Sequence, residues 1–124
     1  MTEPLVLQLS RAQLDAYNRA DVDAFCACYH EDVVVLGEDG AVTLRGMDAF
    51  RARYAGMFAS HDEVHAEVDA RLLLPPHVVE RETWARRDRA TGVRSRGEVL
   101  VRYTERDGRI AVVAFLMPAT PPAP

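Results

Sequence analysis

Hydrophobic positions recur at two different intervals along the chain, and the interval changes near Glu63. In three stretches before this point, apolar residues recur every three to four positions, as in helices with one buried face. After it, apolar and polar residues alternate or form short apolar runs between proline, glycine and aspartate, as in strands. This order predicts an α+β domain in which three N-terminal helices pack on a mainly antiparallel sheet.

Capping and turn residues mark where the predicted helices and strands begin and end. Asp21 is suited to cap a helix, because its side chain can accept from the free amides of the first turn. Pro75-Pro76 interrupts the strand pattern, and Asp107-Gly108 is a strong hairpin signal. The predicted elements are a helix at Leu5–Asn18, a helix after Asp21, strands at Val33–Leu36 and Ala41–Arg45, a helix from Gly46 to Ser60, and strands at Val64–Leu74, His77–Arg87, Val93–Thr104 and Arg109–Met117.

The turns predict a register for the long strands. A tight turn at Pro76-His77 places Arg71 opposite Glu82, and the later turns extend the register to the end of the chain. A one-residue slip or bulge would exchange the two faces of a strand. One predicted face carries Asp69, Arg71, Glu82, Trp84, Glu98, Leu100, Val113, Phe115 and Met117, and the other carries Thr83, Val99, Val101, Tyr103, Val112, Ala114 and Leu116.

Both faces of the last two strands are apolar, so both sides of the sheet should be covered. The helices can cover only one face. The other face would then expose roughly several hundred Å2 of apolar surface to water, which is more than a soluble monomer usually exposes. We therefore expect a two-fold symmetric homodimer. Its predicted contact face is the second set of residues, from Val99 to Leu116.

The run LDAYNRADVDAFCACYHEDVVVL at residues 14–36 resembles the opening of the nuclear transport factor 2-like superfamily. That superfamily includes ketosteroid isomerases and SnoaL-like polyketide cyclases, and its members commonly begin with AxNxxDxDxhxxhhxxDhxh, where h is apolar. With the element order, the resemblance covers Leu5 to Met117. It implies a cone of helices and strongly curved sheet around a ligand pocket. Residues 1–117 would form the single domain, and residues 118–124 a Pro-rich disordered tail.

Ketosteroid isomerases need a carboxylate base and an oxyanion hole made of a tyrosine and a protonated aspartate. Aligning the opening runs without gaps places Gln13 at the tyrosine position and Gly37 at the base position. Counting back from Gly108 places Leu100 at the aspartate position. None of these side chains supplies the required group. Glu38 and Asp39 are alternatives for the base, but they lie in a turn flanked by glycines, where a solvated turn is favoured. We therefore do not expect the usual isomerase reaction.

A different charged set occupies the predicted pocket. Arg71 and Glu82, with Asp69, resemble the aspartate-arginine-aspartate set of limonene epoxide hydrolase-like members, in which one carboxylate activates water and another acts as the acid. The alternative is a structural ion pair, since such pairs also perturb pKa values without catalysis. The aromatic residues that could line the pocket could equally well belong to the hydrophobic core, because aromatic side chains dominate cores. These residues are Tyr17, Tyr54, Phe58 and Trp84. The other predicted pocket-lining residues are Gln13, Tyr17, Tyr54, Phe58, Trp84, Glu98, Leu100, Val113, Phe115 and Met117.

Composition narrows the classes of function. A net charge of −4 and a pI near 5.5 argue against nucleic-acid binding, which requires an electropositive face. The N-terminus lacks the layout of a signal peptide, and the longest apolar run is too short to cross a bilayer, so a cytoplasmic protein is expected. The sequence contains neither an HExxH nor a CxxC motif, so we do not expect a metal site. We also expect no cofactor. Two classes remain open: a binding protein for a small hydrophobic molecule, and a cofactor-independent isomerase, dehydratase or hydrolase.

Overall fold

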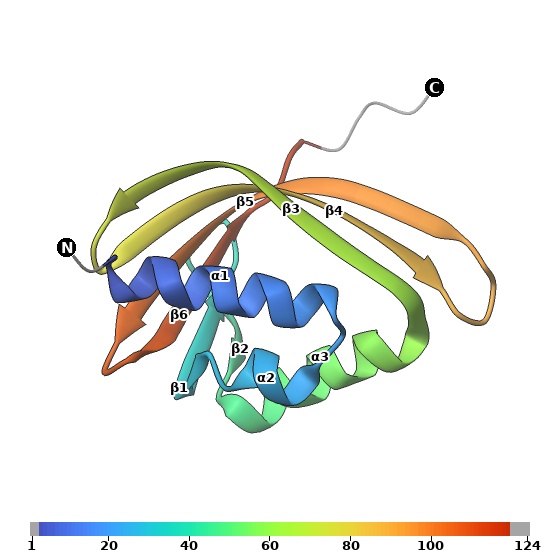
Figure 1. The fold of residues 1–124 in the computed structure, drawn as a ribbon, viewed down its shortest axis with the longest axis horizontal. Coiled ribbons are helices and arrows are strands. Elements are labelled where there is room, and N and C mark those ends of the chain that lie inside the picture. Colours follow the sequence, from blue (N-terminus) through green and yellow to red (C-terminus); the bar gives the residue numbers. More distant parts are fainter. Residues whose placement is uncertain (1–2, 120–124) are drawn as a thin grey trace.

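In the computed structural model, which describes residues 3–119, the helices lie on the concave side of a curved sheet (Figure 1). This arrangement confirms the predicted α+β class. Most of the Pro-rich tail, residues 120–124, lies outside the described residues. The elements are α1 (Leu5–Asn18), α2 (Val22–Cys26), β1 (Tyr29–Leu36), β2 (Val42–Arg45), α3 (Met47–Ser60), β3 (His61–Leu74), β4 (His77–Asp88), β5 (Arg94–Arg106) and β6 (Arg109–Leu116).

The predicted helix boundaries hold best where a cap defines them. The Asp21 side chain accepts from the amide of Ala24 at 3.0 Å and caps α2, as expected. However, α2 ends at Cys26, and Tyr29 already belongs to β1. The strand begins early because Tyr29 pairs with Ile110 of β6, whose amide donates to the carbonyl of Cys28. Hydrogen bonding to a distant strand therefore starts β1 four residues before the predicted Val33.

The sheet is an open array in the order β2-β1-β6-β5-β4-β3. All neighbouring strands are antiparallel except β1 and β6, which are parallel. The long strands β3, β4 and β5 arch over α1 in Figure 1. Helices α1 and α3 both contact the sheet, so its concave face is covered by helices. None of the helices within residues 3–119 has the length and hydropathy needed to span a membrane.

An aromatic cluster joins the helices to β1. Phe25 of α2 stacks on Phe50 of α3, with ring centroids 5.8 Å apart, and its centroid lies 4.6 Å from that of Tyr54. Tyr29 of β1 contacts both phenylalanines. Phe25 and Phe50 are almost completely buried, so these rings form the main apolar support of the helical layer.

The predicted register between β3 and β4 is wrong. Arg71 pairs with Glu80, and Glu82 pairs with Val68. Leu74 pairs with His77, which places the turn at Pro75-Pro76, one residue earlier than expected. The register shifts again between Val68 and Ala70. Neither feature has a signal strong enough to be read from the sequence alternation.

The predicted faces of β5 are also exchanged. Glu82 pairs with Val99 in place of Leu100, because the loop before β5 is one residue longer than expected. Asp88 pairs with Val93 at the base of this loop and stabilises it by accepting from two loop amides at 2.9 Å.

The hairpin between β5 and β6 begins as predicted, with Arg106 opposite Arg109. A bulge between Thr104 and Glu105 then shifts the pairing by one residue, so that Val101 lies opposite Phe115. As a result, the homodimer face inferred from the sequence is divided. Val99, Val101 and Tyr103 are buried, on the same face as Glu82, whereas Ala114 and Leu116 lie on the outer face.

Candidate functional site

A cavity of about 550 Å3 lies between α1, α3 and the concave face of the sheet. α3 contributes Arg53, Tyr54 and Met57 to its wall, and β4 contributes Glu82, Trp84 and Arg86. The apolar lining also includes Tyr17 of α1, Val35 and Leu36 of β1, Val99 of β5, Phe115 of β6 and, beyond the end of β6, Met117. Glu38, in the loop after β1, adds an exposed carboxylate to the wall.

A second, much smaller cavity of about 40 Å3 lies behind the first. Tyr17, Tyr54, Glu82 and Phe115 line both spaces, so they form the boundary between them. The smaller cavity is the deep end of the site. Its other lining residues include Gln13, Tyr29, Tyr103 and Val113.

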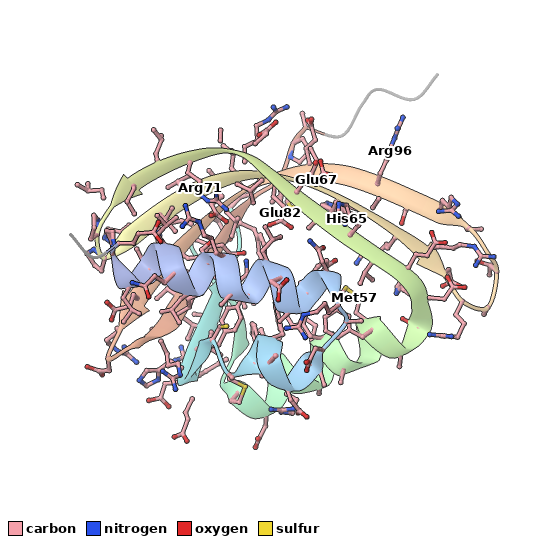
Figure 2. All side chains as sticks on the ribbon, in the orientation of Figure 1. Met57, His65, Glu67, Arg71, Glu82 and Arg96 are labelled. Carbon is pink, nitrogen blue, oxygen red and sulfur yellow. The ribbon has the colours of Figure 1, made fainter. Side chains whose placement is uncertain are left out.

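The β4 residues reach the site because they alternate along one strand. Glu82, Trp84 and Arg86 are two residues apart and therefore project from the same face. In Figure 2 Glu82 lies between the sheet and α1, whereas Arg96, on the neighbouring strand, points away from the helices. One face of β4 thus presents a carboxyl, an indole and a guanidinium to the cavity.

Glu82 is half-buried, and no hydrogen bond to its carboxyl is formed within residues 3–119. Burial, with a smaller contribution from the charge of Glu80, raises the pKa of Glu82 from 4.5 to about 7. A carboxyl in an apolar wall is costly to ionise, because it exchanges water for a medium that solvates charge poorly. Glu82 can therefore release or accept a proton near neutral pH.

The partner of Arg71 is Glu80, which corrects the predicted Arg71–Glu82 pair. Arg71 Nε and Ser10 Oγ both donate to Oε2 of Glu80 at 2.6 Å. Glu80 is 0% exposed, and its Oε1 has no partner among the described residues. This triad joins α1, β3 and β4 and does not line the cavity.

Asp69 also lies outside the site. Its carboxylate accepts from Arg81 at 2.9 Å, and Arg81 donates to Glu98 at 2.8 Å. These exposed side chains form a charge network on the outer face of the sheet. Of the predicted charged set, only Glu82 reaches the cavity.

The predicted pocket residues fall into three groups. Tyr17, Tyr54, Trp84, Phe115 and Met117 line the larger cavity, and Gln13 and Val113 line the deep end. Phe58 does not line either space but packs in the aromatic cluster, with its centroid 5.6 Å from Tyr17. The prediction was wrong for Glu98 and Leu100, which lie on the outer face because β5 is shifted by one residue.

Several residues of the cavity wall were not predicted. Three of them, Arg53, Met57 and Arg86, come from α3 and β4, and the others include Glu38, Thr43 and the apolar Val35, Leu36 and Val99. The alternation along β4 could have identified Arg86, since it shares the parity of Glu82 and Trp84. The four-residue spacing of Arg53 and Met57 places both on one face of α3.

The deep end contains a chain of hydrogen bonds between neutral side chains. The Tyr29 hydroxyl donates to Oε1 of Gln13 at 2.9 Å, and Nε2 of Gln13 donates to the carbonyl of Ser10 at 3.1 Å. Tyr103 lines the same end of the cavity beside Tyr29. Burial raises the pKa of Tyr29 and of Tyr103 well above 10, so both phenols stay protonated.

The three positions aligned with the isomerase residues carry no such acid or base. Gln13 is held by Tyr29 and by its own helix, and Gly37 lies on the cavity wall without a side chain. Leu100 points to the outer face, and its inward-facing neighbours are the apolar Val99 and Val101. Within residues 3–119, no three His, Cys, Asp or Glu side chains are grouped as metal ligands.

Trp84 is fixed in the wall by a contact with the backbone of the neighbouring strand. It pairs with Gly97, and a Cβ placed on Gly97 would lie 2.6 Å from Cζ2 of the indole. This distance is too short for any side chain at residue 97 unless the indole moves. Trp84 therefore occupies space that glycine leaves free.

Comparisons with known proteins agree with this architecture. A family model described as a SnoaL-like domain matches residues 10–113. No curated protein matches the chain.

Solved structures share the fold at low identity. A Δ5-3-ketosteroid isomerase from Mycobacterium sp. has a TM-score of 0.82 and 18% identity over 94% of this chain and 95% of its own. A Mycobacterium tuberculosis protein in complex with estradiol-17beta-hemisuccinate has a TM-score of 0.80 and 16% identity over 91% and 93%. An uncharacterised cystatin-fold protein from Novosphingobium aromaticivorans has a TM-score of 0.79 and 24% identity over 93% and 99%. The chain therefore belongs to the SnoaL-like domain family, within the nuclear transport factor 2-like superfamily.

Proposed function

We propose that the protein binds a small hydrophobic molecule in the cavity above the concave face of the sheet. The observation that carries this proposal is a mostly apolar and aromatic space of about 550 Å3 with the half-buried carboxyl of Glu82 at its deep boundary. Ligand sites are typically concave and mostly apolar, with a few polar groups that orient the ligand. No cofactor is part of the proposal.

The related structures favour the same class of ligand. One neighbour is a ketosteroid isomerase, and another was solved with a steroid ester. Since folds of this family carry many activities, the neighbours support a hydrophobic ligand and do not identify it.

Binding can be tested with N-phenyl-1-naphthylamine, a neutral fluorophore whose emission rises in apolar surroundings. We expect a saturable rise in emission on titration with the native protein. Val99→Phe should weaken binding at least about tenfold, because Val99 lines the cavity and the added ring fills it.

Leu100→Phe is the matched control, since Leu100 is the next residue of β5 and lies on the outer face. This variant should bind as the native protein does. An unsaturable signal in the native protein, or equal binding by the two variants, would contradict the proposal.

A second candidate function is acid–base catalysis on the bound molecule by Glu82. The specific observation is that burial raises the pKa of Glu82 to about 7, where a carboxyl can act as base or acid near neutral pH. The charged set inferred from the sequence is reduced to this residue, because Arg71 and Asp69 lie elsewhere. The reaction class that fits is proton transfer at a carbon or oxygen atom of a hydrophobic substrate.

We also propose that the protein forms a homodimer through the outer face of the sheet. After correction of the register, this face presents Leu100, 41% exposed, and Leu116, 52% exposed. Val112 and Ala114 lie on the same side of β6. Water-exposed apolar side chains on adjacent strands favour burial against a second copy of the same surface.

Light scattering coupled to size-exclusion chromatography at micromolar concentration should give twice the chain mass. Leu116→Arg should shift the mass toward that of a monomer, because it places charge in the contact surface. Leu5→Arg, at an exposed leucine of α1, is the control and should leave the mass unchanged. A monomeric native protein would defeat this proposal.

A further inference from the structure

Two arginines of the cavity wall have no carboxylate partner within residues 3–119. Arg53 and Arg86 both line the cavity, and neither forms an ion pair with a described residue. Neighbouring arginines behave differently: Arg81 and Arg87 are paired with aspartates at 2.9 and 2.5 Å. Of the arginines without a carboxylate partner among residues 3–119, these two line the cavity where a ligand would lie.

The contacts of Arg86 hold its guanidinium in place without satisfying it. Nη1 donates to Sδ of Met57 at 3.2 Å, and Cζ lies 4.4 Å from the ring centroid of Trp84. A thioether is a weak acceptor, and an aromatic face accepts no ordinary hydrogen bond. Most of the five N–H donors of Arg86 therefore remain available, on a planar group already fixed by its neighbours.

Both arginines act on the same part of the cavity. Burial raises the pKa of Tyr54, the positive charges of Arg53 and Arg86 oppose this effect, and the charge of Glu82 adds to it. Tyr54 also lines the cavity, so its hydroxyl marks a region that both guanidinium groups reach electrostatically. Arg53 is exposed and Arg86 half-buried, which places this region toward the open side of the cavity.

The carboxyl of Glu82 lies on the same strand as Arg86, earlier in β4. Four residues separate Arg86 from Glu82, so their Cα atoms are about 13 Å apart, with Trp84 between them. Trp84 thus lies between Arg86 and Glu82 along this face of β4, with the Arg86 guanidinium over its ring. The cavity therefore has two arginines on its open side and Glu82 at its deep boundary. The exposed carboxylate of Glu38 also lines the wall, where it accepts from the amide of Met117 at 2.6 Å.

We propose that the ligand of this cavity is a hydrophobic carboxylate, whose anionic group binds Arg86 with support from Arg53 and whose apolar body lies against Trp84 and Phe115. The inference rests on the proposed binding function and specifies its ligand class. Arg86 supplies a planar pair of donors that matches the two oxygens of a carboxylate. Arg53 adds a second charge on the open side.

Calorimetric titration with 2-naphthoate and 2-naphthamide tests this proposal, because the two probes share one apolar body and differ in charge. We expect the native protein to bind 2-naphthoate about tenfold more tightly than 2-naphthamide, since hydrogen bonds to a charged group are stronger than neutral ones. Arg86→Gln should abolish this preference and leave 2-naphthamide binding unchanged. Arg86→Lys should retain part of it, because it keeps the charge but loses the planar pair of donors.

Arg96→Gln is the matched control, since Arg96 lies on the neighbouring strand and points away from the helices (Figure 2). It should preserve the preference for 2-naphthoate. Equal affinity of the native protein for both probes, or a preference that survives in Arg86→Gln, would overturn the anion proposal while the hydrophobic cavity stands. Binding of neither probe, together with no binding of N-phenyl-1-naphthylamine, would overturn the binding function itself.

Discussion

Arg71→Met is expected to lower the free energy of unfolding by about 3 kcal/mol, the lower end of the range found when one partner of a buried ion pair is removed, because 29% of the Arg71 side chain is exposed to water. The variant leaves the fully buried carboxylate of Glu80 with a single donor, Ser10 Oγ, and its second oxygen already lacks a partner among the described residues. Urea denaturation followed by circular dichroism measures the loss.

Arg81→Met is the matched control on the outer face. Its partners Asp69 and Glu98 are exposed, with 53% and 55% of their side-chain surface accessible, so the cost should be only about 0–1 kcal/mol. Equal losses in the two variants would contradict the burial of the Arg71–Glu80 pair.

Glu82→Gln is expected to make the protein more stable at pH 8 and to remove part of its pH dependence. Burial raises the pKa of Glu82 from 4.5 to about 7, so the folded state binds this proton more tightly than the unfolded chain does. The contribution of Glu82 to stability is complete below pH 4.5 and is lost as the pH rises through 7. The total change is about 3 kcal/mol, from 1.36 kcal/mol per pKa unit.

The measurement is the free energy of unfolding of both proteins at pH 5 and pH 8. The advantage of Glu82→Gln over the native protein should be larger at pH 8, because glutamine carries no charge at either pH. Glu98→Gln removes an exposed carboxylate from the outer face and should show no comparable difference between the two pH values. A constant difference between Glu82→Gln and the native protein would mean that Glu82 does not titrate near neutrality, and it would remove the basis for acid–base catalysis.

The order of the elements could be predicted because it depends on signals that act locally. Helical spacing in α1 and α3, the cap at Asp21 and the hairpin signal at Asp107-Gly108 each fix structure within a few residues. The early start of β1 at Tyr29 could not be predicted in this way. It depends on pairing with Ile110, far along the chain.

The register of the long strands was predicted wrongly because it depends on features of a single residue. An extra loop residue between Asp88 and Val93, and the bulge between Thr104 and Glu105, together turn β5 over relative to its neighbours. Because side chains alternate from face to face, each shift exchanges inside for outside. Strands that are apolar on both sides give no pattern against which to detect such a shift.

The site was consequently predicted in part. The aromatic residues Tyr17, Tyr54, Trp84 and Phe115 line the cavity, since they belong to elements whose orientation the periodicity defines. The charged candidates depended on register and were mostly misplaced. Arg71 has a different carboxylate partner, and Asp69 lies on the outer face.

The contact between Trp84 and Gly97 has a consequence for how this scaffold can diversify. Gly97 contributes no side chain to the cavity, yet the indole occupies its position because no Cβ is present there. Substitution at residue 97 alone would displace the largest ring of the wall, changing the shape of the binding space while every lining residue stays the same. Selectivity for ligands of different width can therefore evolve, or be engineered, through one position that does not itself touch the ligand.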